Sequence, residues 1–378
     1  MTRRSVVSPH DQSATFVELF FDLVFVFCVT QVVGLLHHDL SWAGTGRAVL
    51  VFWLVWWGWT QLTWALNAAD TEHPLVEFGT LLATAVAFFM AVAIPDAFAG
   101  GGLRFAVPYV LVRAIGLGIY AWVTSADPSQ KAAVLTFALV STGGMAAALI
   151  GGLAGGDTQL YLWGLMIFLD LVAATVGAQS EHWNIHPRHF AERHGLIVII
   201  ALGESLIVAA GGLAGVELGG QVVGVAVLAV LTSCALWWTY FPVAKPRLEA
   251  ALESVSGSDQ SRMARDVFSL FHFPMLCGVV AFAVALEEAI AHPADPLGPA
   301  GRLALGAGPL LFVGGMAAAM WRATCGRLAP RVGLSVLTAG AVFLLAGLPP
   351  LASIGTVFVG AAAIAIVEEG KAQRLNVR

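Results

Sequence analysis

The chain has few charged residues: Asp, Glu, Lys and Arg together make up 11% of its 378 residues. Soluble domains carry about 25%. With 58% hydrophobic residues and a mean hydropathy of +0.82, the composition excludes a soluble globular protein, because such a chain would aggregate in water. No cluster of basic residues is present, which argues against a nucleic-acid partner.

Cysteine is also scarce, and the few cysteines show no paired spacing. Three of the four lie in apolar runs, so we expect reduced, structural thiols. They are Cys28, Cys234, Cys277 and Cys325. The chain also lacks a P-loop, a dinucleotide fingerprint, a Ser-His-Asp elbow and an Asp-rich diphosphate motif. We therefore expect no cofactor and no metal, and the missing diphosphate motif counts against prenyl chemistry.

Long apolar runs dominate the sequence. A membrane-spanning helix needs about 20 apolar residues, and about 17 are tolerated. Twelve segments meet this criterion: 16–38, 47–66, 75–94, 105–123, 131–151, 160–178, 195–213, 221–242, 264–288, 302–321, 332–348 and 351–368. Turn residues separate them, for example at 67–74, where Asn67 is read as the first turn residue, and at 126–128. The sequence predicts an all-α, polytopic integral membrane protein with about twelve transmembrane helices.

The placement of Lys and Arg indicates the orientation. If the N-terminus is cytoplasmic, nearly all basic residues fall in cytoplasmic segments, and only Arg47, Arg104 and Arg302 fall in outer loops. Cytoplasmic loops carry an excess of Lys and Arg. We therefore predict that both termini are cytoplasmic and that the protein lies in the cytoplasmic (inner) membrane.

The two halves of the chain show similar patterns. Phe-Val-Glu at 16–18 opens the first span, Phe-Ala-Glu at 190–192 opens the seventh, and Trp-rich runs follow in both halves. Six helices per half start both halves on the same side of the membrane, which is a parallel repeat. We predict two six-helix halves, 1–178 and 195–378, joined by a cytoplasmic connection at 179–194. Chance similarity between apolar helices is the alternative.

Acidic side chains and one arginine lie inside the predicted spans. Glu18 and Asp22 are four residues apart, so they share one face of a helix. Arg113, Asp170 and Glu204 lie deeper, and we expect one of these two acids to neutralise the arginine. Charges that face lipid are costly, so these faces should turn toward the interior of the helix bundle.

The remaining candidate residues lie near the cytoplasmic ends of spans. Glu77 is at the start of the third span, and Glu192, Arg193 and His194 precede the seventh. A metal site needs convergent ligands. Pro187 interrupts any helix in the His-rich connection, so we expect a hinge whose His and Arg side chains meet lipid headgroups. For the charged groups within the spans, satisfied networks that fix helix register are the alternative to a functional role.

Two stretches resemble the signatures of a known family. Residues 17–27 read VELFFDLVFVF, and residues 190–196 read FAERHGL and continue to ALGES at 201–205. The chain therefore resembles the bacterial low temperature requirement A family. The resemblance implies a polytopic membrane protein tied by name to growth in the cold, and it gives no residue a biochemical role.

Three functions are compatible with these patterns. A transporter or channel-like protein would move an unknown small solute or ion along a polar path, with transport linked to protons or cations as one form of this hypothesis. The residues of that path are Glu18, Asp22, Arg113, Asp170 and Glu204. An integral membrane enzyme would act on a lipid or isoprenoid at the cytoplasmic face. Its acid, base and anion-binding groups are Glu18, Asp22, Glu77, Glu192, Arg193 and His194.

The third function is a lipid-sensing or scaffold protein linked to growth in the cold. It predicts that neutralising Glu204 and Asp170 leaves function intact in a folded variant. For every one of the three functions, the expected partners are the lipid bilayer and an unidentified small solute, ion or lipid.

Overall fold

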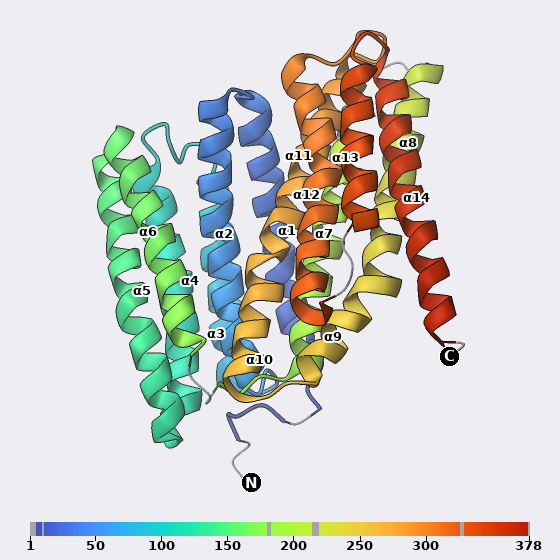
Figure 1. Cartoon of the computed structure of the whole chain (residues 1–378). Helices are drawn as coiled ribbons and strands as arrows, with labels where there is room; N and C mark the ends of the chain where they lie inside the picture. The colour runs from blue at the N-terminus through green and yellow to red at the C-terminus, as the bar shows by residue number, and fades with distance from the viewer. Residues whose placement is uncertain (1–4, 10, 180–182, 214–218, 326–328, 377–378) are drawn as a thin grey trace. The chain divides into compact units, whose positions relative to one another are not determined.

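The structure is a computed structural model (Figure 1). It describes residues 5–9, 11–179, 183–213, 219–325 and 329–376. Within these ranges the chain forms helices and no β-strand, and Val7 and Ala69 form an isolated antiparallel bridge. The all-α prediction is confirmed. Helices suit a bilayer because each backbone N–H and C=O group finds its partner within the same segment.

The helices are labelled α1 to α14 (Figure 1). They are α1 (Phe16–His38), α2 (Trp42–Ala68), α3 (Pro74–Val92), α4 (Gly102–Val123), α5 (Pro128–Ala154), α6 (Gly156–Gly177), α7 (Pro187–Leu213), α8 (Gly220–Thr239), α9 (Lys245–Glu253), α10 (Gly257–Met263), α11 (His272–Ala291), α12 (Pro299–Thr324), α13 (Ala329–Leu344) and α14 (Pro350–Asn376). A 3-10 turn, η1 (Thr124–Ala126), follows α4. Two π-helical segments, η2 (Tyr240–Ala244) and η3 (Ala264–Leu270), join α8 to α9 and α10 to α11.

Within the described residues, 11 helices are long and apolar enough to cross a membrane. The segment α13 is apolar but has only 16 residues. The predicted spans match these helices in order, while the eighth and ninth extend further, to Gly220–Glu253 and Gly257–Ala291, because η2 and η3 continue them. The chain is therefore a multi-pass helical membrane protein.

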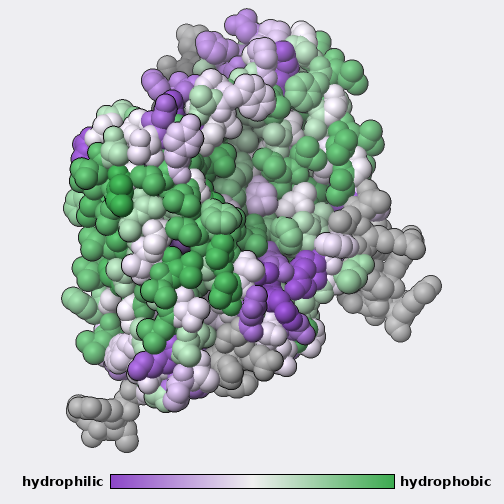
Figure 2. All heavy atoms as spheres, turned by 60° about the vertical axis from the view of Figure 1, so that its left-hand side comes forward, coloured by the Kyte–Doolittle hydropathy of each residue, from purple (hydrophilic) through white to green (hydrophobic). Residues whose placement is uncertain are grey.

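Large apolar side chains cover the outer faces of several helices. Phe78 and Phe89 on α3 are exposed, as are Leu139 on α5 and Phe168 on α6. Figure 2 shows a broad hydrophobic area, with hydrophilic residues gathered above and below it. A contiguous apolar surface of this kind matches the acyl chains of a bilayer.

One sequence prediction about a helix end is wrong, and another differs by two residues. The turn predicted at 67–74 lies at 69–73, because α2 ends at Ala68 and α3 begins at Pro74, and Asn67 is a buried residue of α2. Pro187 is predicted to interrupt a helix, but it is the first residue of α7, where no N–H is needed for an intrahelical bond. As a consequence His189, Arg193 and His194 are buried within α7 and do not meet lipid headgroups.

The chain divides into two compact units. The first comprises Met1–Leu35, Trp42–His194 and Leu252–Arg265. The second comprises Leu36–Ser41, Gly195–Ala251 and Asp266–Arg378. The predicted six-plus-six repeat, its halves and its orientation in the membrane stay predictions.

In the first unit, α4 packs against α2, α3 and α5, and α5 packs against α6, as the blue and green helices of Figure 1 show. Glycines bring α4 and α5 into backbone contact: a Cβ atom added to Gly152 would lie 2.7 Å from the carbonyl oxygen of Gly102. The turn between α5 and α6 uses positive φ angles of 66° at Gly155 and 56° at Gly156. Because α2 contacts both α4 and α6, polar side chains of these three helices can meet.

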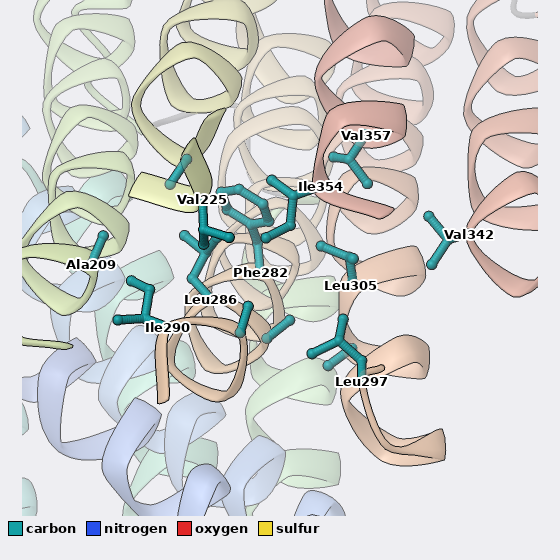
Figure 3. Close-up of a cluster of buried hydrophobic side chains, with 14 of the residues drawn as sticks. Ala209, Val225, Phe282, Leu286, Ile290, Leu297, Leu305, Val342, Ile354 and Val357 are labelled. Atoms are coloured by element: carbon teal, nitrogen blue, oxygen red, sulfur yellow. The ribbon is translucent and has the colours of Figure 1, made fainter. Parts of the chain in front are cut away.

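The second unit has an apolar core (Figure 3). Phe282, Leu286 and Ile290 lie on one face of α11, with Val225 of α8 and Ile354 of α14 in the same buried cluster. Lipid is as apolar as these side chains, so close packing, more than exclusion of water, stabilises such a core in a membrane.

Candidate functional site

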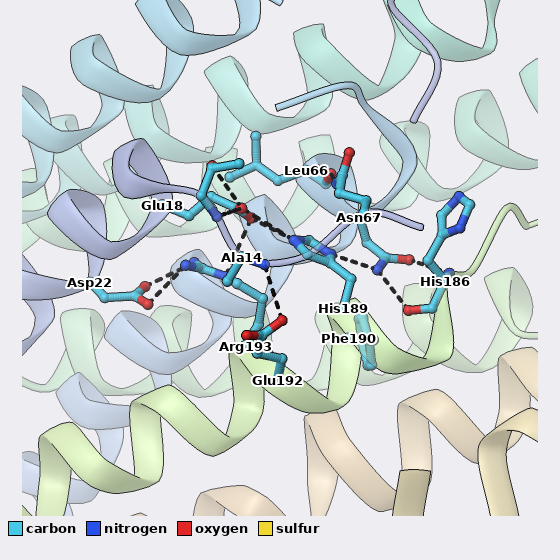
Figure 4. A network of polar contacts seen from close by, with 12 residues as sticks. Ala14, Glu18, Asp22, Leu66, Asn67, His186, His189, Phe190, Glu192 and Arg193 are labelled. Atoms are coloured by element: carbon cyan, nitrogen blue, oxygen red, sulfur yellow. Dashed lines mark hydrogen bonds and ion pairs between the residues drawn. The ribbon is translucent and has the colours of Figure 1, made fainter. Parts of the chain in front are cut away.

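Two acids on α1 face one arginine on α7 (Figure 4). The Nη1 and Nη2 atoms of Arg193 donate to the two carboxylate oxygens of Asp22, each at 2.8 Å, so the contact is bidentate. The Nε atom of Arg193 lies 3.5 Å from Oε1 of Glu18. None of the three side chains has exposed surface. The prediction that Glu18 and Asp22 share one face is confirmed.

The contacts between α1 and α7 have a constant offset in sequence. Glu18 contacts His189 and Asp22 contacts Arg193, and both pairs are 171 positions apart. The first turns of the two helices therefore run parallel. Residues one turn apart on α1 contact residues one turn apart on α7. We call the connected side chains the Arg193 network. Its members are Glu18, Asp22, Trp59, Asn67, His189 and Arg193.

Trp59 on α2 closes the Asp22 side of the network. Its Nε1 donates to Oδ1 of Asp22 at 2.8 Å. The guanidinium of Arg193 lies 5.6 Å from the centre of the Trp59 ring, in cation–π contact. The ring of His194 meets Trp59 edge-on, and its Nδ1 donates to the carbonyl of Phe190 at 2.9 Å. The Trp59 ring thus packs against the ion pair, and the burial of the pair strengthens its attraction by keeping water away.

Glu18 also caps its own helix. The N–H and the hydroxyl of Thr15 donate to Oε2 of Glu18, at 2.9 Å and 3.0 Å. Thr15 directly precedes α1 and Glu18 is the third residue of that helix, which is the spacing of a capping box. The cap holds the Glu18 carboxylate at the first turn of α1, where it also meets His189 and Arg193.

Asn67 connects the network to the start of α7. Its Oδ1 accepts the backbone N–H of His186 at 2.9 Å, and its Nδ2 donates to the His186 carbonyl at 3.1 Å. The same Nδ2 lies 2.9 Å from Nδ1 of His189. The Nε2 of His189 lies 3.0 Å from Oε1 of Glu18. A series of hydrogen bonds therefore runs from half-buried His186 to fully buried Glu18.

The segment before α1 covers this end of the first unit. We call residues 5–9 and 11–15 the N-terminal strap. Val7 of the strap forms the isolated bridge with Ala69, just after α2. The N–H of Ser8 donates to the carbonyl of the last residue of α2 at 3.1 Å. The strap is therefore attached along the end of α2.

The strap is attached to α7 and its approach as well. The hydroxyl of Ser8 lies 2.5 Å from Nε2 of His186. The N–H of Ala14 donates to Oε2 of Glu192 at 3.1 Å. The predicted candidate Glu192 is therefore a contact of the strap, and it is only half-buried.

A second buried ion pair involves the opposite side of α2. Nη1 of Arg113 on α4 lies 2.8 Å from Oδ1 of Asp170 on α6. Oε1 of Gln61 on α2 accepts from Nε of Arg113 at 2.5 Å, and the hydroxyl of Tyr109 accepts from Nη1 at 2.8 Å. Arg113 and Asp170 have no exposed surface. The prediction that an acid neutralises Arg113 is confirmed, and that acid is Asp170. We call the contact between Arg113 and Asp170 the Arg113 pair, and Gln61 and Tyr109 are its hydrogen-bonded neighbours.

The two ion pairs lie at nearly the same level along α2. Trp59 of α2 donates a hydrogen bond to Asp22 in one pair, and Gln61 of α2 accepts one from Arg113 in the other. Two residues on a helix differ by a rise of about 3 Å and a rotation of about 200°. One helix thus separates two buried arginine–carboxylate contacts. Among the described residues, Nη2 of Arg113 has no hydrogen-bond partner, whereas both Nη atoms of Arg193 donate to Asp22.

Two predicted candidates are not brought into these clusters. Glu77 is exposed on α3. Glu204 is buried on α7 but belongs to the second unit. In that unit, another buried polar contact joins the hydroxyl of Tyr240, at the start of η2, to Nε2 of His272 at 2.7 Å.

Sequence reasoning did not assign Trp59, Asn67 or His189 to a site. Asn67 carried a usable signal, because an amide at the end of an apolar run is costly unless it is hydrogen-bonded. Trp59 carried none, since it is one of several tryptophans in the same helix. The sequence predicts a hinge around His189, because Pro187 suits a helix break as well as the first position of a helix.

The chemistry open to the Arg193 network is ion pairing and proton exchange. Its groups are two carboxylates, an imidazole and a guanidinium, all without exposed surface. Within the parts of the chain that the structure describes, no three His, Cys, Asp or Glu side chains converge as a metal-binding group.

Comparisons with known proteins cover nearly the whole chain. Residues 13–366 match a family model described as bacterial low temperature requirement A protein (LtrA). A relative from Rhizobium meliloti (strain 1021), described as uncharacterized protein RA0937, is 33% identical over 345 residues, which is 86% of this chain and 82% of that protein. No solved structure matches the chain. The matched region contains both buried ion pairs.

Proposed function

We propose that this chain, which belongs to the bacterial low temperature requirement A protein family, acts as a transporter of the cytoplasmic membrane. The substrate class is a small solute or an ion. The Arg193 network is the part of the first unit whose ion pairs break and re-form during transport. Its surroundings are the lipid bilayer, and neither a nucleic acid nor a cofactor takes part.

One observation supports this proposal most strongly. The Arg193 network is buried within apolar spans, yet hydrogen bonds continue from it to half-buried His186 and to the strap. Charges inside a membrane-spanning bundle are costly, and they mark solute, ion or proton pathways. A network that only fixed helix register would need no such connection to the surface.

A buried ion pair also supplies a two-state element. Arg193 meets two acids on neighbouring turns of α1, with a bidentate contact to Asp22 and a longer contact to Glu18. A small shift of α7 along α1 would change the acid that Arg193 prefers, and packed helices switch between discrete arrangements of this kind. In the proposed orientation the strap lies at the cytoplasmic end.

An integral membrane enzyme acting on a lipid or isoprenoid is the alternative. Acid–base chemistry requires a substrate within hydrogen-bond reach of the acting groups. Glu18, Asp22, Arg193 and His194 have no exposed surface, and Glu77 is exposed on a different helix. This burial favours transport over chemistry at the membrane surface.

The test begins with cells that lack the gene. Metabolites are compared between cells that express the wild-type chain and cells that express the double variant Asp22→Asn/Arg193→Gln. We expect the cellular level of one solute to depend on the wild-type chain. In liposomes, the purified wild-type chain should carry this solute, whereas flux with the purified double variant should fall to the level of protein-free liposomes. Removing both charges of a buried pair is often close to neutral for folding. Glu18 loses its contact with Arg193 but keeps its hydrogen bonds with Thr15 and His189, so the variant should still be purified.

The matched control is Asp157→Asn, which removes one exposed carboxylate at the start of α6 and should keep wild-type flux. Wild-type flux of that solute in the double variant would refute the transport role of the network. A lipid-sensing or scaffold role makes the opposite prediction: folded chains with neutralised Asp170 and Glu204 would then still support growth in the cold.

A further inference from the structure

The side-chain amide of Asn67 has a fixed orientation. Its Oδ1 faces the backbone N–H of His186, which can only donate, and its Nδ2 faces the His186 carbonyl, which can only accept. Exchanging the oxygen and the nitrogen of the amide would turn both bonds into repulsions. The backbone of His186 therefore determines which atom of the amide is which.

This orientation fixes the protonation of His189. The second N–H of Asn67 points at Nδ1 of His189 across 2.9 Å, so Nδ1 presents a lone pair. The ring proton is then on Nε2, which donates to the carboxylate of Glu18 at 3.0 Å and 3.2 Å. His189 is thus neutral, in the Nε2–H tautomer.

The two carboxylates of the network are surrounded by donors. The donating residues are Thr15 and His189 toward Glu18, and Trp59 and Arg193 toward Asp22. A carboxyl group that only accepts hydrogen bonds is ionised. Among the described residues Arg193 is the one cation in contact with both acids, so with His189 neutral the network carries one negative charge in excess.

A buried excess charge favours the binding of a cation. A metal ion needs several oxygen ligands with free lone pairs, whereas the oxygens of Glu18 and Asp22 already accept bonds from N–H and O–H groups. The lone pair of His189 Nδ1 differs, because its partner is a neutral amide that can turn. A proton is the cation that this geometry can accept.

We propose that the Arg193 network binds one proton, at Nδ1 of His189, and that Asn67 makes this binding conditional on the release of His186. A hydronium ion transfers its proton to the Nδ1 lone pair, so one N–H bond forms, one O–H bond breaks and a water molecule leaves. The amide of Asn67 must then turn so that its Oδ1 accepts the new N–H. In doing so it gives up both of its bonds to the backbone of His186.

The groups that face His189 support this step. Glu18 from α1 faces Nε2, Asn67 from α2 faces Nδ1, and Arg193 one turn further along α7 is already held by Asp22. Doubly protonated His189 would balance the network, with two carboxylates against two cations. The new positive charge is therefore compensated where it forms.

Release of His186 also affects the strap. The ring of His186 contacts the hydroxyl of Ser8, and half-buried Asn184 approaches the same hydroxyl at 3.4 Å. Proton uptake thus loosens the end of the first unit that the strap covers. Its use as the coupling step rests on the proposed transport function, whereas the proton site itself does not.

Nitrogen-15 NMR of the full-length chain in lipid nanodiscs, with labelled histidine and backbone, tests the site directly. The variant His189→Gln identifies the signals of His189 by their loss. At neutral pH we expect an unprotonated Nδ1 and a protonated Nε2. On acidification the unprotonated Nδ1 signal should disappear, and the backbone N–H signal of His186 should shift in the same pH interval.

Variants of Asn67 sharpen the test. With Asn67→Leu the amide donor is gone, so we expect both His189 tautomers at neutral pH and no link between His189 and His186. With Asn67→Asp an acceptor faces Nδ1, and we expect doubly protonated His189 at neutral pH. The control Gln12→Ala removes a strap bond to the carbonyl of Leu66 and should leave the tautomer unchanged.

Two results in the spectra of the wild-type chain would overturn the inference, even if the Asn67 variants do not fold. One is a proton on Nδ1 of His189 at neutral pH. The other is a His186 shift in a separate pH interval from the protonation of His189. Neither result bears on the proposed transport function, which the flux measurement of Asp22→Asn/Arg193→Gln tests separately. Conversely, the wild-type chain could give the expected spectra while the double variant keeps wild-type flux. That combination would refute the transport role of the network but would support the proton site at His189.

Discussion

The Arg193 network and the Arg113 pair both place a buried arginine beside α2, and they differ in what surrounds it. Arg193 has two acids within reach and hydrogen-bonded neighbours that continue to the strap. Arg113 has one acid, with an amide and a phenol as its other partners. One arrangement is extended and has two acids for one arginine, and the other is local and has one acid for one arginine.

The difference separates two uses of a buried charge. The Arg113 pair connects α2, α4 and α6, and loss of either charge leaves the other without compensation. The Arg193 network has two acids for one arginine, so one acid can lose its charge without leaving Arg193 unpaired, and the network can bind a proton. We therefore expect substitutions at the Arg113 pair to act mainly on stability and those in the Arg193 network mainly on activity.

The largest effect on stability is expected from Asp170→Asn. It leaves the Arg113 guanidinium buried without a carboxylate, and losing one side of a buried ion pair costs about 3–5 kcal/mol. The purified variant in detergent should lose its monodisperse form at a clearly lower temperature than the wild-type chain. Heating followed by size-exclusion chromatography measures this.

The double variant Arg113→Gln/Asp170→Asn is the matched control for that prediction. It removes both charges and leaves side chains that can still form hydrogen bonds, so most of the thermal stability should return. If the double variant is as unstable as Asp170→Asn, packing between the helices and not the uncompensated charge explains the loss.

A smaller effect on stability is expected from Glu18→Gln. Arg193 keeps its bidentate contact with Asp22, and the excess negative charge disappears. The new amide N–H₂ group faces donors from Thr15 or His189, and an unsatisfied buried group costs about 1–3 kcal/mol. In the same heating assay the loss should be smaller than for Asp170→Asn. A larger loss would contradict the view that this network has an acid to spare.

Loosening the strap should affect one region and spare the other. Gln12→Ala removes a 3.1 Å bond to the carbonyl of Leu66, which is worth about 1 kcal/mol. We expect faster hydrogen exchange at the amide of Asp70, which donates to Val6 of the strap at 2.8 Å. Amides of α4, beside the Arg113 pair, should exchange at the wild-type rate. Equal acceleration in α4 would mean that the variant destabilises the whole first unit.

The helical architecture was predictable because its signals are local. Length and hydropathy identify spans, and Gly155, Gly156 and Asp127 mark helix ends by their backbone or capping preferences. Two boundaries were not predictable in this way. Asn67 and Pro187 suit a turn as well as a helix terminus, and the contacts of Asn67 with the start of α7 distinguish the two.

The candidate site was predictable in its faces but not in its partners. The spacing of Glu18 and Asp22 places them on one side of α1, and this follows from helix geometry alone. Nothing local indicates that Asp22 meets Arg193, because the two are 171 positions apart. For Arg113 the sequence left Asp170 and Glu204 equally suitable, and tertiary packing selected Asp170.

The smallest effect is expected at Asp127, a surface carboxylate outside both regions. Hydrogen bonds from Ser129 and Gln130 at the start of α5 hold the pKa of Asp127 below its usual value of 3.8. Since folding lowers this pKa, the contribution to stability is present above the unfolded value and is lost as the pH falls through the folded value. Asp127→Asn cannot titrate, so its melting temperature should fall slightly less than that of the wild-type chain between neutral and acid pH. Identical pH profiles would show that the charge of this cap contributes no measurable stability, and that the acid sensitivity of the chain arises elsewhere.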